Sequence, residues 1–329
     1  MASPWPSTPF RLISSTGVNT RRDVPPEHYC RRNAQIMALT HNTIFRGLNA
    51  IYHQAPLVQP STQEASDLLF YCIVVHDFIH EHHTTEETVY FPAIEAASGI
   101  VGLMSNNLEQ HRQLEKGLDA FRKYADETPA SAYSSDVLRQ LIDDLAAPLE
   151  THLHEEIPTI LDLHQKIDSK TLQKIYGKMH DEAERISDKF KYTYPPFQFI
   201  VLAICLHLSV LILCLRCTNR AGPFVLGSQD KSFLLDDTYI NFPEVPSIVP
   251  YLVDWILSRR HQGAWRFNCS DMYGNPRPFP NRFDATSRTY PVSKGQGSMA
   301  RVWSSGLISF VLLLLCVFAA VKFGGLTSV

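Results

Sequence analysis

Histidines and glutamates occupy positions in this chain where helical periodicity calls for apolar core residues. Four stretches between residues 28 and 166 repeat apolar side chains at steps of three and four, the pattern of an amphipathic helix. Each stretch has one or two inward positions taken by a residue able to bind a metal. These residues are His41, His82, Glu86, His111, His152 and Glu156. A chain that folds this way must place imidazoles and carboxylates in its interior.

The connections between the four stretches are short. Turn-like segments at 59–62, 97–99 and 128–131 separate them. Because short connections favour antiparallel neighbours, we predict an all-α fold with an up-down four-helix bundle within residues 28–192. A fifth, polar helix is expected at about 169–189, and residues 1–27 are interpreted as a leader.

Two of the four stretches share a His-x-x-x-Glu spacing, from His82 to Glu86 and from His152 to Glu156. Residues four apart lie one helical turn apart on the same face, so an imidazole and a carboxylate can reach a common metal pair. A buried carboxylate without a partner is costly, whereas a cation compensates its charge. Two carboxylates with several imidazoles suit two non-haem irons best, and zinc or manganese less well. We therefore predict a di-iron site with the six residues above as ligands.

A second row of ionisable residues lies on the same stretch as His82 but is rotated away from its apolar stripe. We interpret this row as a face that is solvated or that only supports the ligands. Its members are His76, His80, His83, Glu81 and Glu87. His154 and Glu155 also lie off the stripe of their helix.

The segments His82–Pro92 and His152–Pro158 resemble the two HxxxE segments of the hemerythrin-like, HHE cation-binding family. Met37–Asn42, together with Arg46–Asn49, resembles the first-helix motif of the fungal type. The resemblance covers about residues 28–165. It implies a left-handed four-helix bundle around a carboxylate-bridged di-iron centre, with its ligands at the six positions that periodicity selects.

One position departs from the pattern of the oxygen-carrying family members. They have a second histidine one turn after the third-helix ligand, and here that position is Glu115. We therefore expect a more oxygen-rich site with an altered redox potential, and not an oxygen transporter. Farther along, residues 223–300 include a stretch to about 285 that resembles the carboxyl-terminal extension of fungal members.

Two long apolar runs lie beyond the bundle. Val302–Val321 contains no charged residue, and we expect it to be a carboxyl-terminal transmembrane helix. Phe197–Leu215, within the segment 193–222, is either a second transmembrane helix or an apolar insertion. The expected localisation is therefore a membrane, with the bundle facing the cytosol, and the alternative is a cytoplasmic protein.

Charge and cysteine content narrow the function. Lys plus Arg total 30 and Asp plus Glu total 33, which gives no electrostatic reason to expect nucleic acid as a partner. Seven cysteines form no dense framework and fit a reducing compartment. The first function we consider is a metal protein that binds iron, dioxygen or a related small ligand. The alternatives are a di-iron enzyme that oxidises ferrous iron or decomposes peroxide, and a module in which the metal only staples helices.

Overall fold

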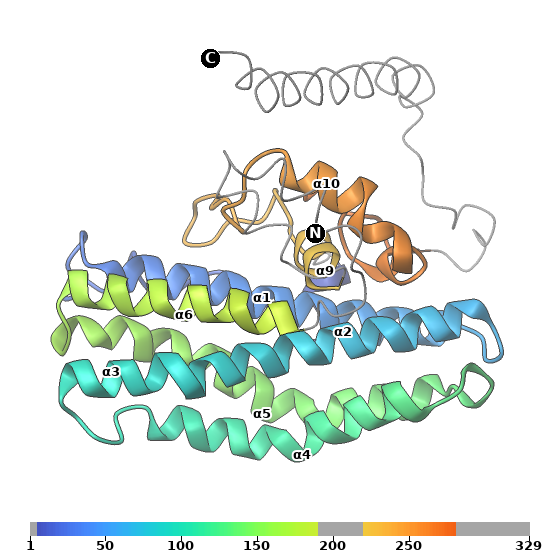
Figure 1. Ribbon diagram of the computed structural model, residues 1–329, viewed down its shortest axis with the longest axis horizontal. Coiled ribbons are helices and arrows are strands. Elements are labelled where there is room, and N and C mark those ends of the chain that lie inside the picture. The colour runs from blue at the N-terminus through green and yellow to red at the C-terminus, as the bar shows by residue number, and fades with distance from the viewer. Residues whose placement is uncertain (1–4, 190–219, 281–329) are drawn as a thin grey trace, which may run out of the picture. The chain divides into compact units, whose positions relative to one another are not determined.

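The computed structural model describes residues 5–189 and 220–280, and its long elements are all helices. Successive long helices run in opposite directions and lie side by side as a bundle, with a fifth long helix packed against it (Figure 1). The four bundle helices are α1 (Tyr29–Gln54), α2 (Gln63–Thr85), α4 (Ser105–Glu127) and α5 (Ser135–Asp162); the fifth is α6 (Ser169–Lys189). The prediction of an all-α fold is confirmed.

Side-chain caps and a left-handed glycine set the ends of the helices. The Thr62 hydroxyl accepts the Ala65 amide at 3.2 Å at the start of α2, and the Ser134 hydroxyl accepts the Val137 amide at 3.4 Å at the start of α5. The short helix α3 (Phe91–Ser98) ends at Gly99, whose φ of 70° is left-handed. Glycine adopts this conformation at little cost, whereas residues with a side chain do not. All of these residues lie at or beside the predicted turns.

A π-helical turn, Glu86–Tyr90, joins α2 to α3, and α3 continues the line of α2 in Figure 1. Its signature is the hydrogen bond from the Phe91 amide to the Glu86 carbonyl, five residues back. A π turn holds one residue more than an α turn, so the side chains before and after it do not keep a single 3.6-residue phase. The inward side of the chain therefore shifts in phase between α2 and α3.

Two asparagines on α1 hold the leader in an extended conformation. Asn42 exchanges hydrogen bonds with the backbone of Ile13, at 2.7 and 2.9 Å, and Asn49 does the same with Phe10, at 2.9 Å for both. Seven residues of helix rise about 10.5 Å, and three extended residues span about 10 Å. The spacing of the asparagines thus matches the spacing of the leader amides.

Residues 220–280 pack against α1 and α2 through short helices and turns. These are α9 (Ala221–Gly227), α10 (Val249–Trp255) and the 3-10 turns Leu257–His261 and Ala264–Phe267. Gly47 of α1 permits the closest approach, because a Cβ there would lie 2.8 Å from the ring of Phe224, which is fully buried. The bounds proposed above for leader, bundle and extension remain predictions.

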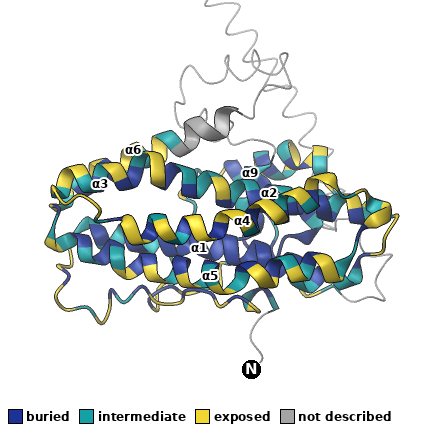
Figure 2. Cartoon of the chain, turned by 90° about the horizontal axis from the view of Figure 1, so that it is seen from below, coloured by how far each residue is buried: buried dark blue, intermediate teal, exposed yellow. Residues whose placement is uncertain are grey.

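The predicted transmembrane helix is not part of the described fold, and this prediction is wrong. Within residues 5–189 and 220–280, none of the helices is long and apolar enough to cross a bilayer. The physical reason is that the long helices are amphipathic: Figure 2 shows exposed residues along the outer sides of α4 and α5 and buried residues facing inward. The runs Phe197–Leu215 and Val302–Val321, on which the prediction rested, lie outside the described residues.

Candidate metal centre

The structure brings all six predicted ligands together and adds a seventh residue. They form two groups, each with its ligand atoms within 4.8 Å of one another. One group is His41, His82, Glu86 and Glu156; the other is His83, His111 and His152. All four bundle helices contribute, since α1 provides His41 and α4 provides His111. The His82–Glu86 pair comes from the end of α2 and the π turn that follows it, and the His152–Glu156 pair comes from α5.

Glu86 links the two groups. Its Oε1 lies 3.3 Å from His82 Nε2 in the first group, and its Oε2 lies 3.6 Å from His111 Nε2 in the second. The side chain of Glu86 is completely buried. Glu156, also completely buried, places Oε2 3.3 Å from His41 Nε2. One carboxylate is thus positioned to contact two ions at once.

Three of the histidines have the Nδ1 atom engaged outside the site. His41 Nδ1 donates to the Leu153 carbonyl at 2.7 Å, and His111 Nδ1 donates to Glu87 Oε1 at 2.7 Å. His152 Nδ1 donates to Gln110 Oε1 at 3.2 Å. A neutral imidazole that donates through Nδ1 keeps an unprotonated Nε2, the form that binds a metal. In each case Nε2 points into the site.

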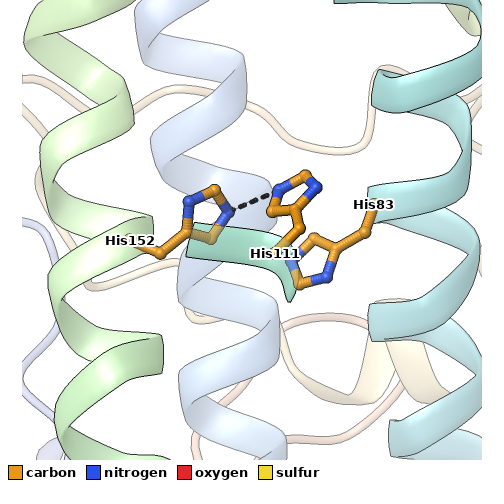
Figure 3. Close-up of side chains that lie close together, drawn as sticks. All are labelled: His83, His111 and His152. Carbon is orange, nitrogen blue, oxygen red and sulfur yellow. Dashed lines mark hydrogen bonds between the residues drawn. The ribbon is translucent and has the colours of Figure 1, made fainter. Parts of the chain in front are cut away.

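The rings of His111 and His152 meet with their Nε2 atoms 2.9 Å apart (Figure 3). Burial lowers the pKa of both rings, and that of His152 well below its usual value, so both are neutral. With each proton on Nδ1, the facing Nε2 atoms present two lone pairs. Two lone pairs at this distance repel unless a cation lies near both, so this pair of rings is arranged for a metal ion.

The buried carboxylates of Glu86 and Glu156 also require a cation to compensate their charge. All four oxygens of Glu86 and Glu156 are buried and have no hydrogen-bond partner in the described structure. Burial, and then the neighbouring charge of Glu156, raises the pKa of Glu86 well above its usual value. Buried acceptors of this kind are costly unless paired, and a divalent or trivalent ion pairs them. The residues present therefore fit a metal centre.

Comparison with known proteins agrees with this geometry. The model of the hemerythrin HHE cation binding domain matches residues 33–163, a range that contains all seven residues. The chain is also 31% identical over 274 residues to the dimeric xanthone biosynthesis cluster protein R11 of Cryptosporiopsis sp. (strain 8999), an alignment covering 83% of this chain and 89% of that protein. This chain belongs to the hemerythrin HHE cation-binding family. As a hemerythrin-like protein it is a metal-binding protein. No solved structure matches it.

His83 is the residue that the sequence-based interpretation of this hemerythrin-like chain misplaced. Only 6% of it is exposed, its ring stacks on that of His111 with centroids 4.0 Å apart, and its Nε2 has no partner in the described structure. The apolar stripe of α2 passes through Ile79, and a step of four from Ile79 reaches His83 as readily as a step of three reaches His82. Helical periodicity therefore permits either histidine to face inward, whereas the predicted ligand set included only His82.

The site also differs from the expectation based on Glu115. That residue is exposed on α4 and belongs to neither group. His83 instead supplies a fifth imidazole from α2. The structure therefore groups five imidazoles with two carboxylates, and the oxygen-rich site expected for this hemerythrin-like protein is not observed.

The remaining off-stripe residues fall into two sets. Glu87, 40% exposed at its side chain, supports His111, and Glu155 holds Gln110 at 2.7 Å, which in turn supports His152. His154 contacts the backbone of the leader at Arg11, at 3.0 Å. His80 is exposed and stacks on the buried His76. Glu81 is half-buried on α2. None of these six lies in either metal group of the described residues.

Proposed function

We propose that this hemerythrin-like protein holds two non-haem irons and binds dioxygen or a related small ligand, such as nitric oxide, at them. The single observation that carries the proposal is Glu86, whose two oxygens face histidines of different groups at 3.3 and 3.6 Å. A carboxylate placed in this way would be able to bridge two ions. The proposed ligands are His41, His82, Glu86, Glu156, His83, His111 and His152.

The chemistry of the donors supports iron or manganese over structural zinc. The Nε2 atoms of His41 and His82 are 3.2 Å apart, and those of His111 and His152 are 2.9 Å apart. Two donors at right angles on one ion, each about 2.1 Å from it, lie about 3.0 Å apart, whereas tetrahedral donors lie about 3.4 Å apart. The 2.9 Å separation fits octahedral donors, and the 3.2 Å separation lies between the two geometries. A donor set of nitrogen and oxygen without thiolates suits iron or manganese, whereas structural zinc sites are closed and mostly use cysteine.

The number of donors supports a small exogenous ligand. If Glu86 and Glu156 both bridge, their four oxygens and five imidazole nitrogens make nine bonds. Two octahedral ions have about twelve positions, so about three stay open. When bound, ferrous ions at such a site supply electrons to dioxygen or share them with nitric oxide.

Side chains and backbone groups around the site exclude water and orient the imidazoles. Tyr90 ends the π turn and Phe91 follows it; both are completely or almost completely buried, and the Phe91 ring lies 5.7 Å from that of His111. The Tyr90 hydroxyl accepts a hydrogen bond from Asn33 Nδ2. These aromatic side chains exclude water, while Leu153, Glu87 and Gln110 hold three ligands in the metal-binding tautomer.

The test uses the full-length chain loaded anaerobically with ferrous iron. We expect about two irons per chain and a visible absorption band that appears with oxygen and disappears when oxygen is removed. The variant His82→Ala with Glu86→Ala should lose iron, whereas Glu115→Ala, an exposed residue on α4, should keep it. Unchanged iron content in the double variant contradicts the proposal, and one zinc per chain favours a metal that only staples the helices.

A di-iron enzyme that oxidises ferrous iron or decomposes peroxide is the second candidate. The observation in its favour is the similarity to a protein named for the biosynthesis of dimeric xanthones. Turnover separates the two candidates. An enzyme consumes oxygen or peroxide over many cycles per site, whereas a binding protein takes up one ligand per site and stops.

A further inference from the structure

Arg46 is a buried cation on the side of α1 that faces away from the metal centre. It follows His41 by five residues, which rotates it by about 140° around the helix. Only 2% of Arg46 is exposed. The extension covers it, and the guanidinium lies 4.8 Å from the centre of the Phe233 ring.

The hydrogen bonds of Arg46 are incomplete. Nη1 donates to the Ser228 carbonyl at 3.3 Å, and Nη2 has no partner in the described structure. Asp230 is the carboxylate whose charge influences the pKa of Arg46, but the two side chains form no ion pair in the described structure. Its Oδ1 accepts the amide and the hydroxyl of Ser232 instead, at 2.8 and 2.6 Å. Burying a guanidinium without a hydrogen-bonded anion is costly, and burial accordingly lowers its pKa.

Two further polar groups at the same place also lack partners. The Tyr71 hydroxyl of α2 and the Ser228 hydroxyl after α9 are fully buried, and neither makes a well-formed hydrogen bond in the described structure. They are neighbours: burial raises the pKa of Tyr71, and the nearby Ser228 hydroxyl opposes that rise. Ser228 also carries the carbonyl that Arg46 contacts. We call Arg46, Tyr71 and Ser228 the Arg46 cluster.

We propose that the Arg46 cluster binds a small monovalent anion, a halide or the carboxylate group of a small organic acid. Arg46 Nη2 and the hydroxyls of Tyr71 and Ser228 are donors, and such an anion accepts from all three while neutralising the guanidinium. The thiol of Cys269 also influences the pKa values of Arg46 and Tyr71. It does not neutralise Arg46, because burial raises the pKa of this thiol and keeps it protonated. The anion joins α1 and α2 to the extension at a site separate from the metal centre.

Anomalous scattering is the direct test. Crystals of the full-length protein soaked in sodium bromide should show a peak within hydrogen-bond distance of Arg46 Nη2, Tyr71 Oη and Ser228 Oγ. A crystal of the variant Tyr71→Phe with Ser228→Ala should not show it. A water molecule in place of bromide in the wild-type crystal overturns the proposal.

Thermal stability gives the second readout and identifies the source of the anion. At equal ionic strength, chloride or formate should raise the Tm by about 2 to 4 °C relative to gluconate, which is too large for a buried site. The double variant, which keeps the aromatic ring of Tyr71, should lose this response, and Arg112→Gln, at an exposed ion pair, should keep it. A response to chloride alone identifies a halide site, and a response to formate alone identifies a carboxylate site. An equal response in wild type and double variant overturns the proposal.

Discussion

The carboxylate of Glu87 accepts a hydrogen bond from His111 Nδ1 at 2.7 Å. Because Glu87 is 40% exposed, it can be replaced without disturbing the core. We expect Glu87→Ala to weaken metal binding by about 10- to 100-fold, since a ligand without its supporting acceptor is less basic and less well oriented. Glu87→Gln keeps an acceptor and should weaken it less. Metal titration of both variants, with Glu115→Gln as control, measures the difference.

His83 is the residue by which the seven-residue site of the structure differs from the six-residue site that periodicity predicted. If His83 is a ligand, His83→Ala should lower the affinity for one of the two ions by about 10- to 100-fold and leave the other bound. The matched control is His80→Ala, an exposed histidine one turn earlier on α2. Equal iron content in the two variants excludes His83 from the site.

Metal binding should release a proton from Glu86. Its raised pKa means that the metal-free protein keeps this carboxyl protonated above 4.5, its ordinary value, until the pH passes the raised value. Metal affinity should therefore increase with pH through that window. Burial lowers the pKa values of His82, His83 and His152 well below their usual value, so these histidines are neutral near pH 7 and contribute no proton there. Calorimetry in buffers of different ionisation enthalpy counts the protons released.

Gly47 tests the fit between α1 and the extension. A glycine in the middle of a helix normally costs about 1 kcal/mol relative to alanine, so Gly→Ala usually stabilises. Here the new Cβ would collide with the buried ring of Phe224, and we expect Gly47→Ala to destabilise by about 1 to 3 kcal/mol. Urea unfolding measures both this variant and its control, Gly177→Ala in α6, where a Cβ meets no atom within 4 Å. The control should be stabilised, and a stabilised Gly47→Ala contradicts the collision.

The prediction from sequence succeeded where a single helical period decides what faces inward. His41, His111 and His152 replace core residues in a 3.6-residue stripe, and the structure buries all three. It failed at His83, because His82 and His83 both lie about one turn after Ile79, and helical periodicity alone does not show that both face inward.

Contacts between distant parts of the chain could not be predicted either. Arg46 and Gly47 look like an exposed arginine and a helix-weakening glycine until the extension is placed on them. Periodicity reports which side of a helix is apolar, and it does not report what a neighbouring segment far along the chain will cover.

Residues 41–51 of α1 are buried without exception. One side of this segment carries His41, a second carries the asparagines that hold the leader, and a third carries Arg46 and Gly47 against the extension. Three turns of helix therefore offer no solvent-facing site at which a label, a tag or a surface charge could be introduced without loss. Surface substitutions are better placed on α4 or α5, whose outer sides are exposed.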